Sequence, residues 1–583
     1  MQYLKKYKKY FLAMAFYLFL SVLLTWPLIL NINKGVVGEE GDNLLFVWNH
    51  WHVGHSLVNF QNPYFTDLIA YPLTSNLVFH TLTIFNSFLS SVLQLFLPLV
   101  LSFNIIFILS LAVAALGMFL LSDYIFRHSY AAFFTGVVFA FNAYIFGEAQ
   151  GHFQYTSIYI IPFYILFYLK LFKEGKYKNA IFAAILLAIS FYNDFYYSIG
   201  LILFSVLFAA WMFGVDKKTF VSNIKKILLL FFVFIILSLP LIFLSVKTVL
   251  QKEIPSTTLG QINLFTPDIR SLFIPSHYQT SFGKHFVNYY SSLGFHGGII
   301  YPSFILILLS LLGYFYEKNE GIFKGRFLAW GSFFFLVMAL GPFLFWDGYV
   351  FNAGGVLFTI PLPYLLFYSL PFMNGILVPP RFIIFSILFL AILSGYFLKN
   401  LFKKIEKMRM LSMAVLFLVI GVYLFEVAAI PFPITSTKVP EFYYELGKDE
   451  GEYAIMELPF ALSTSFYTLG LGDATPSKTE YYQTVHKKKI LSAWISRVPA
   501  DYYNFFNSLT GLNFLINSDE SAIKEVEKNR EKIKSNFKKL NIQYIIIHPE
   551  YYNHIQLRDT INIMQVIYKI KPKLINNMLV YKL

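Results

Sequence analysis

The chain has 583 residues, of which 57% are apolar, 20% aromatic and only 13% charged. This composition excludes a water-soluble fold for most of the chain and is typical of a protein that crosses a membrane many times. The formal net charge is +14, but the Lys and Arg residues fall in short clusters between apolar runs, which indicates membrane orientation and not a nucleic-acid surface. The sequence contains no cysteine, which excludes disulfides and metal–thiolate sites.

The first apolar run, residues 10–30, follows a basic N-terminus. Its length suits a hydrocarbon core about 30 Å thick, and no small-residue cleavage site follows it. We therefore expect a retained anchor and not a secretion signal, with its basic end in the cytoplasm.

Eleven apolar segments of spanning length follow one another along the chain, and basic clusters occur at every second junction. The predicted spans are residues 10–30, 105–126, 130–147, 155–172, 178–193, 195–214, 227–247, 297–316, 327–346, 382–400 and 411–430. Because basic residues concentrate on the cytoplasmic side, this alternation sets both the number of spans and their orientation. The sequence therefore predicts a multi-pass plasma-membrane domain over residues 1–430, with a large outer loop at 31–104.

The apolar stretch 81–101 is not counted among these spans. Pro98, the early Asn86 and the lack of flanking charge are typical of a helix that lies at the outer surface or dips in and returns. If this stretch crossed the membrane, every later span would invert and the basic clusters would lie outside.

Residues 38–43 (GEEGDN) come directly after the first span and combine three carboxylates with two glycines. The glycines predict a backbone turn where the helix leaves the membrane. Glu39, Glu40 and Asp42 have two interpretations: solvated loop carboxylates at an interface, or catalytic acids and bases of a membrane enzyme.

Further ionisable residues lie on the same predicted face. Glu148 and His152 stand at one short outer turn, and Asp194 stands between two aromatic-rich spans. Ionisable groups at membrane depth are costly and usually face a cavity, so we expect several of these side chains to converge on one cleft. Asp42 with Glu148 or His152 could hold Mg²⁺ or Mn²⁺, which prefer carboxylate oxygens.

Three histidines in residues 48–55 (WNHWHVGH) suggest a metal site. In a helix, however, only His52 and His55 are close enough in register to be neighbours. The favoured interpretation is an amphipathic helix lying on the membrane, with its Trp rings at headgroup level.

Residues 370–382 enter the tenth predicted span from outside, and their prolines force an extended approach. Arg381 then stands at the outer interface, either as a snorkelling arginine or as a clamp on a lipid phosphate. Arg270, in the long outer loop that begins at Gln251, is a second substrate-binding candidate of the same kind, and a solvated arginine is its more ordinary interpretation.

From Pro431 the composition becomes that of a soluble domain. Residues 451–459 and 542–548 are typical of buried strands, 518–540 of a charged helix, and 578–583 of a closing strand. The sequence thus predicts a small extracytoplasmic α/β domain over residues 431–583. The predicted cytoplasmic connections are short, and no Gly-rich phosphate loop occurs, so a cytosolic nucleotide site is excluded.

This order of elements resembles the GT-C superfamily of membrane glycosyltransferases. Within it, the chain is similar to a group of prokaryotic membrane proteins akin to the YfhO family and, more distantly, to protein O-mannosyltransferases and aminoarabinose transferases. The matching motifs are residues 42–48 (DNLLFVW), 71–72 (YP), 151–152 (GH), 370–382, 482–486 (YQTVH) and 496–497 (SR).

The resemblance implies transfer of a sugar from a polyprenyl-phosphate donor to a glycan, lipid or protein outside the cytoplasm. The superfamily's first-loop acid, a base or metal ligand, carries over to Asp42. Its second outer acid falls on Glu148, where the Gly-His context differs from the usual Asp, and Arg381 or a metal would receive the phosphate. Two alternatives stay open: a flippase of lipid-linked precursors, which usually has related halves that this sequence does not show, and a non-enzymatic envelope assembly protein.

Overall fold

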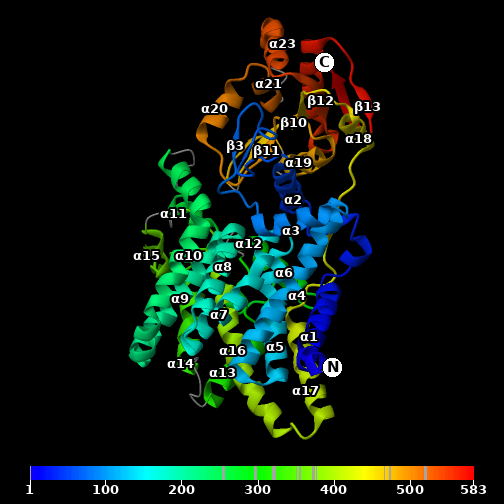
Figure 1. Cartoon of the computed structure of the whole chain (residues 1–583). Coiled ribbons are helices and arrows are strands. Elements are labelled where there is room, and N and C mark those ends of the chain that lie inside the picture. Colours follow the sequence, from blue (N-terminus) through cyan, green and yellow to red (C-terminus); the bar gives the residue numbers. More distant parts are fainter. Residues whose placement is uncertain are drawn as a thin grey trace. The chain divides into compact units, whose positions relative to one another are not determined.

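A computed structural model of the chain shows two compact units, which we describe one by one (Figure 1). It describes residues 2–251, 257–293, 298–317, 324–349, 351–353, 356–370, 375, 377–464, 466–471, 475–517 and 522–583. Unit 1 comprises residues 1–31, 104–240 and 256–433, and unit 2 comprises residues 32–103, 241–255 and 434–583.

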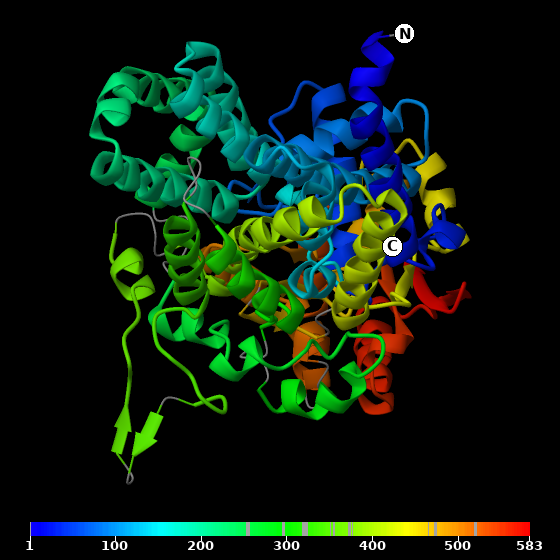
Figure 2. The same cartoon turned by 90° about the horizontal axis from the view of Figure 1, so that it is seen from below.

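Unit 1 is helical. Its helices are α1 (Gln2–Leu24), α4 (Leu99–Phe126), α5 (Ser129–Ala140), α6 (Ala143–Glu148), η2 (Phe153–Tyr159), α7 (Ile160–Glu174), α8 (Tyr177–Asn193), α9 (Phe195–Val215), α10 (Lys217–Leu250), α11 (Leu259–Leu264), α12 (Val287–Leu293), α13 (Phe304–Tyr316), α14 (Gly325–Ala339), α15 (Tyr364–Tyr368), η7 (Pro379–Phe382), α16 (Ile383–Lys404) and α17 (Arg409–Val427). Helices α4 and α10 continue into unit 2. A short hairpin of β4 (Phe351–Ala353) and β5 (Val356–Phe358) extends away from the helices (Figure 2).

Helix α16 forms the centre of unit 1, packing against α5, α13 and α14. It is apolar on all sides, as expected for a helix enclosed by others. Gly313 of α13 makes this close approach possible, because a Cβ at that position would lie 1.8 Å from the backbone oxygen of Leu393. Small residues at helix contacts are characteristic of membrane helix packing.

Within the described residues, seven helical stretches, three of which combine two consecutive helices, are long and apolar enough to cross a membrane. They cover residues 99–126, 129–148, 153–174, 195–215, 217–250, 379–404 and 409–427. The chain is therefore a mostly helical membrane protein. Helices α13 and α14 are shorter apolar helices, and each of the other predicted spans also coincides with a helix. The count of eleven and the orientation of the spans stay predictions.

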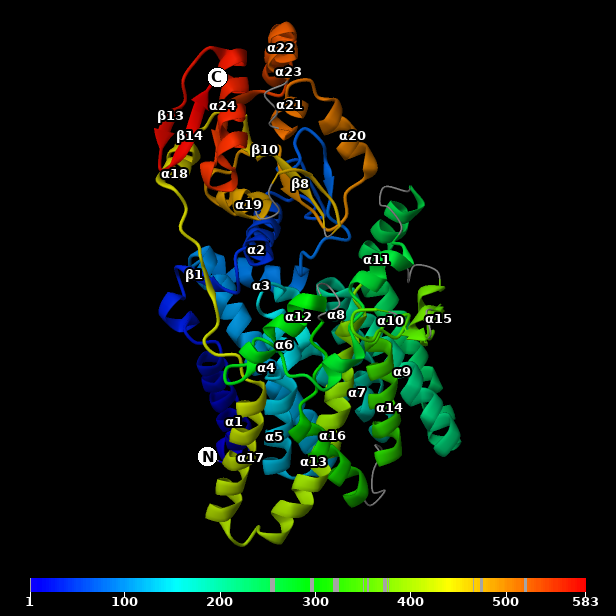
Figure 3. The ribbon, with the colours of Figure 1, turned by 180° about the vertical axis from the view of Figure 1, so that it is seen from behind.

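Unit 2 contains an α/β fold around a five-stranded sheet of order β10-β7-β12-β14-β13 (Figure 3). Its strands are β7 (Ala454–Leu458), β10 (Lys489–Ile490), β12 (Ile542–Ile547), β13 (Lys573–Ile575) and β14 (Met578–Lys582). Strands β10, β7 and β12 run parallel, while β14 is antiparallel to β12 and β13. β7 is buried along its whole length and β12 along most of it, which matches their near-continuous apolar sequence.

Helices and a second sheet complete unit 2. The helices are α2 (Asp42–Val58), α3 (Ile84–Gln94), α18 (Glu441–Lys448), α19 (Thr475–His486), α20 (Ala500–Ser508), α21 (Leu512–Asn517), α22 (Ile523–Lys528), α23 (Arg530–Lys539), η9 (Pro549–Tyr551) and α24 (His554–Tyr568). The second sheet has the order β11-β8-β9, with β8 (Ala461–Ser463), β9 (Thr468–Gly470) and β11 (Ala493–Trp494).

The predicted elements of the soluble segment are confirmed with changes. The two buried strands and the closing strand occur as β7, β12 and β14. The single helix predicted for 518–540 is divided at Asn529 into α22 and α23, and residues 518–521 lie outside the described part. Helix α3 has 11 residues, fewer than the roughly 20 that a span requires, so its place at the outer interface stays a prediction.

By its contacts the first outer loop groups with unit 2, and the division of the chain at residue 430 stays a prediction. Residues 32–103 pack with the C-terminal segment. Strand β1 (Gly35–Val37) pairs antiparallel with β6 (Ile434–Ser436), which joins the start of the loop to the start of the soluble segment. A sequence boundary at 430 could not show this pairing, because its two strands are about 400 residues apart.

Candidate functional site

The acidic turn of residues 38–43 is held by side chains on both sides. Gly38 has φ 103°, a left-handed conformation that favours glycine. The Asn43 side-chain amide donates to the carbonyl of Val37 (3.2 Å) and to Thr435 Oγ1 (2.8 Å), and Thr435 Oγ1 donates to the carbonyl of Gly38 (2.7 Å). Asp42 is therefore fixed as the first residue of α2, half-buried, at a helix N-terminus that favours negative charge.

The other two carboxylates of the turn have different surroundings. Glu40 forms an ion pair with Lys478 of α19 (3.1 Å) and accepts a hydrogen bond from the Tyr551 hydroxyl (3.0 Å). Glu39 is exposed. Glu40 thus holds the turn to the soluble segment of unit 2, and catalytic roles for Glu39 and Glu40 stay predictions.

Sequence reasoning missed a buried carboxyl close to Asp42. Glu480 of α19 has no exposed surface, and its Oε1 accepts from the backbone nitrogen of Trp494 (2.6 Å). Burial raises the pKa of Glu480 well above its usual range, and the negative charge of Asp42 acts in the same direction. Nothing in the sequence separates this glutamate from the exposed ones, because its burial depends on α2 packing against α19.

Helix α2 is confirmed as a helix, but the prediction that its Trp rings lie at headgroup level is wrong for Trp48. Trp48, His50 and His52 are all buried. The Trp48 indole donates to Gln483 Oε1 (2.8 Å), so this ring lies between helices and not at headgroup level. α2 packs against α3 and α19, which supply the apolar surroundings that the sequence analysis assigned to lipid.

Burial also sets the protonation of three histidines in this region. It lowers the pKa of His50 to about 3, of His52 to about 4 and of His80 to about 3. His80 Nδ1 accepts from the backbone nitrogen of Ser496 (3.2 Å), as only a neutral ring can. The three rings are therefore neutral at physiological pH.

We expect acid to destabilise unit 2 through these histidines. Their folded pKa values lie below the unfolded value of about 6.5, so their contribution is present above pH 6.5 and lost as the pH falls. At pH 5 each ring costs about 2 kcal/mol of unfolding free energy. Urea unfolding of the detergent-solubilised protein at pH 7.5 and pH 5 measures the loss.

The matched variant for this measurement is His80→Gln, which removes one titrating ring. Glu480 opposes the histidines, because its raised pKa favours the folded state in acid, so the difference between wild type and variant is the relevant quantity. Between pH 7.5 and pH 5, His80→Gln should lose about 2 kcal/mol less unfolding free energy than the wild type. An identical loss in both proteins would contradict the assignment.

In unit 1, the side chains of Glu148 and His152 contact each other, as their i,i+4 spacing allows. Glu148 ends α6, whose N-cap Asn142 accepts from the backbone nitrogen of Ile145 (3.0 Å). His152 Nδ1 lies 3.1 Å from Glu148 Oε2, with the His152 side chain 49% exposed and that of Glu148 18% exposed. The pair is accessible to a ligand.

Asp194 occupies the turn between α8 and α9, outside both helices. Its side chain caps α9 by accepting from the backbone nitrogen of Tyr197 (3.0 Å). Burial raises the pKa of Asp194 to about 7, the hydrogen bonds lower it, and the charge of Glu148 raises it further. The structure thus gives Asp194 a capping role and places it within electrostatic reach of Glu148.

Arg381 lies between two tyrosine rings. Its guanidinium carbon is 3.9 Å from the ring centroid of Tyr155 and 4.0 Å from that of Tyr196. The Tyr196 hydroxyl accepts from the backbone nitrogens of Leu377 (2.7 Å) and Val378 (3.2 Å), which ties the approach to Arg381 onto α9. Residues 371–374 and 376 of that approach lie outside the described part.

Glu148, His152, Asp194 and Arg381 therefore gather in one part of unit 1, named here the Arg381 cluster. Tyr155 connects its members, since its ring contacts both Arg381 and the His152 ring (5.8 Å between centroids). The sequence analysis named the four ionisable residues but missed the two tyrosines, and the aromatic residues around Asp194 were the only signal for them.

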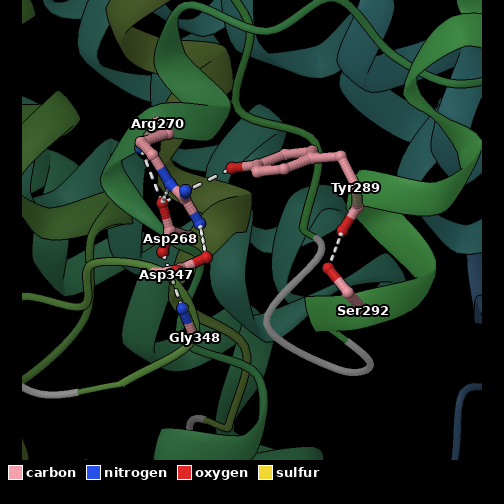
Figure 4. Close-up of polar contacts among 6 residues, drawn as sticks. All are labelled: Asp268, Arg270, Tyr289, Ser292, Asp347 and Gly348. Carbon is pink, nitrogen blue, oxygen red and sulfur yellow. Dashed lines mark hydrogen bonds and ion pairs between the residues drawn. The ribbon is translucent and has the colours of Figure 1, made fainter.

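Arg270 belongs to a separate ion-pair group (Figure 4). Its guanidinium lies 3.0 Å from Asp268 Oδ1 and 2.5 Å from Asp347 Oδ1. The buried Asp268 also accepts from the backbone nitrogen of Gly348 (2.9 Å), which closes the long loop onto residues 347–348. Two carboxylates neutralise Arg270, an arrangement typical of a structural ion pair, and its substrate-binding role stays a prediction.

The predicted metal site does not form as a complete ligand set within the residues that the structure describes. Among them, no group of three or more His, Asp or Glu side chains could hold a metal ion. Glu148 and His152 supply two adjacent ligands of unit 1, while Asp42 belongs to unit 2. The convergence of Asp42 with the Arg381 cluster also stays a prediction.

No family model matches the sequence, and no curated protein matches it. Solved structures are similar to it in arrangement. The archaeal oligosaccharyltransferase AglB from Archaeoglobus fulgidus, in complex with an inhibitory peptide and a dolichol-phosphate, matches with 12% identity and a TM-score of 0.47, covering 94% of this chain and 70% of that one. The apo form of the Archaeoglobus fulgidus oligosaccharyltransferase matches with 12% identity and a TM-score of 0.47, covering 98% and 73%. A complex of that enzyme with Zn and sulfate matches with 12% identity and a TM-score of 0.46, covering 92% and 68%.

Proposed function

We propose that this protein is a GT-C-type membrane glycosyltransferase. It moves a sugar from a polyprenyl-phosphate donor to a glycan, lipid or protein acceptor on the extracytoplasmic side. The Arg381 cluster carries this proposal, because it combines an arginine fixed between two rings with a Glu–His pair that is accessible to a ligand.

Arg381 is the proposed partner of the donor phosphate. The Tyr155 and Tyr196 rings hold the guanidinium by cation–π contacts. A planar fork held in this way suits two oxygens of a phosphate and stabilises the charge that develops as the sugar leaves. His152, held by Glu148, adds a donor beside it.

Asp42 is the proposed base. In the transfer step the acceptor attacks the anomeric carbon, the bond from that carbon to the phosphate oxygen breaks, and the proton of the acceptor passes to the Asp42 carboxylate. It lies in the first turn of α2, where the helix N-terminus favours a negative charge on the carboxylate. The phosphate leaves as an anion and needs a cation, not a general acid.

The test is a transfer assay with labelled polyprenyl-phosphate sugars and the purified protein in liposomes. We expect Arg381→Lys to lower transfer by about 10²-fold, because lysine keeps the charge but loses the fork and the stacking. The matched control is Arg558→Lys, an exposed arginine paired with Asp559 in unit 2, which should transfer at the wild-type rate. Label that crosses the bilayer without being transferred would contradict the proposal in favour of a flippase.

A further inference from the structure

Unit 2 has a groove that takes no part in the proposed transfer. It lies between the walls formed by α22–α23 and by α24, which pack side by side (Figure 3), and it has a volume of about 640 Å³. We name it the basic groove for its four cationic lining residues, Lys528, Arg530, Lys532 and Lys569.

The cations stand on both walls of the groove. Lys528 and Lys532 come from the α22–α23 side and are exposed, and Lys569 comes from the end of α24 and is also exposed. Arg530 is half-buried and is fixed by a hydrogen bond from its Nε to the carbonyl of Ile567 (2.8 Å). A ligand in the groove therefore meets positive charge from two sides.

The surrounding sequence strengthens this charge. Residues 523–573 contain eleven Lys and Arg against five Asp and Glu. A charged helix pair is usually only a solvated face, but here the cations line a concave surface, where charges of one sign raise the local concentration of an oppositely charged ligand. The ligand class that fits is a polyanion.

The remaining lining residues distinguish between polyanions. None of the ten residues that line the groove is aromatic, so the stacking platforms used for single-stranded nucleic acid are missing from its lining. Asn562 and Gln565 offer amides, and Glu527 and Glu531 offer acceptors, all of which suit hydroxyl groups.

We propose that the basic groove binds a polyanionic carbohydrate, that is, a hydroxyl-rich chain with spaced acidic groups. The acid groups pair with the lysines and Arg530, and the hydroxyls pair with the amides and carboxylates between them. The acid could be a carboxylate or a phosphodiester, and both present the same anionic oxygens to the groove. This site does not depend on the proposed transferase activity.

The test is fluorescence anisotropy of labelled oligomers with the full-length protein in detergent. The probes are oligogalacturonate, a glycerol-phosphate oligomer, a neutral glucan and single-stranded DNA of matched length. We expect at least one of the two acidic oligomers to bind, with affinity that falls as salt is added. Comparison of these two identifies the acid group, and the neutral glucan should not bind.

Two triple variants of equal charge locate the site. Lys528→Gln with Lys532→Gln and Lys569→Gln removes the groove lysines, and we expect about 10-fold weaker binding. Lys524→Gln with Lys538→Gln and Lys539→Gln removes exposed lysines outside the groove lining, and we expect less than about a twofold change. All six lysines are exposed, and equal melting temperatures confirm that both variants fold. Equal losses in the two variants, tighter binding of DNA, or no binding by either acidic oligomer would overturn the proposal.

Discussion

The Asp42→Asn variant should lose sugar transfer by a factor on the order of 10²–10⁴ while it remains folded and inserted. Asparagine is nearly isosteric with aspartate, and Gly41, not Asp42, is the N-cap residue of α2. The unfolding free energy should therefore change by no more than about 0.5 kcal/mol. What asparagine cannot do is accept the acceptor's proton. The transfer assay with labelled donor measures the transfer rate, and urea unfolding measures the unfolding free energy.

Glu39→Gln and Glu40→Gln are the comparison variants, because each removes the same charge from the same turn. Glu39 is exposed, and Glu40 is held by Lys478 and Tyr551. Comparable losses in all three variants would indicate a general electrostatic effect and not a base at Asp42. Full activity in a folded Asp42→Asn protein would show that Asp42 is not the base. Glu148 and Asp194 of the Arg381 cluster would then be the candidates.

Glu457→Ala should destabilise unit 2 by about 3–5 kcal/mol, the usual cost of leaving a buried charge without its partner. Glu457 lies in β7 and His548 follows β12, and their side chains are 0% and 3% exposed. His548 Nε2 is 2.9 Å from Glu457 Oε2, and the Tyr443 hydroxyl lies 3.0 and 3.1 Å from the two carboxylate oxygens. Removal of the carboxylate leaves the buried His548 ring and Tyr443 hydroxyl without this partner, and the ring must either keep its charge unpaired or lose its proton. Urea unfolding at pH 7 measures the cost.

The same pair gives stability a pH dependence opposite in sign to that of the other buried histidines. Burial alone would lower the pKa of His548, but the hydrogen bonds and charges of Glu457 and Glu550 outweigh it and raise this pKa to about 9. The contribution is therefore fully present below the unfolded value of about 6.5 and is lost as the pH rises through 9. It amounts to about 3 kcal/mol over this window. Glu457→Gln should remove this dependence between pH 6.5 and 9.

Glu550→Gln is the matched control for Glu457. Its carboxylate lies 3.7 Å from His548 Nδ1 and is 51% exposed. Because solvent screens an exposed pair, this variant should cost no more than about 1 kcal/mol. Similar losses of unfolding free energy in the Glu457 and Glu550 variants would show that the buried Glu457–His548 pair does not stabilise the sheet.

The sequence by itself predicted which parts of the chain lie in lipid and which lie in water. Long apolar runs of spanning length predict helices at every one of their positions, because a backbone in lipid must satisfy its own hydrogen bonds. The strands β7, β12 and β14 were also predictable, since buried parallel strands are continuous apolar runs. The ionisable residues of the Arg381 cluster could be named in advance, because charges at membrane depth are rare and costly.

Tertiary structure alone decided what these elements contact. Residues 48–55 have the same amphipathic pattern whether a helix lies on lipid or against protein, and only the Trp48–Gln483 hydrogen bond (2.8 Å) shows that α2 packs on α19. The buried Glu480, the Tyr155–Arg381–Tyr196 stack and the β1–β6 pairing likewise depend on partners far away in the chain. Local periodicity reports which side of a helix or strand is apolar, but it contains no information on which distant residues will cover that side.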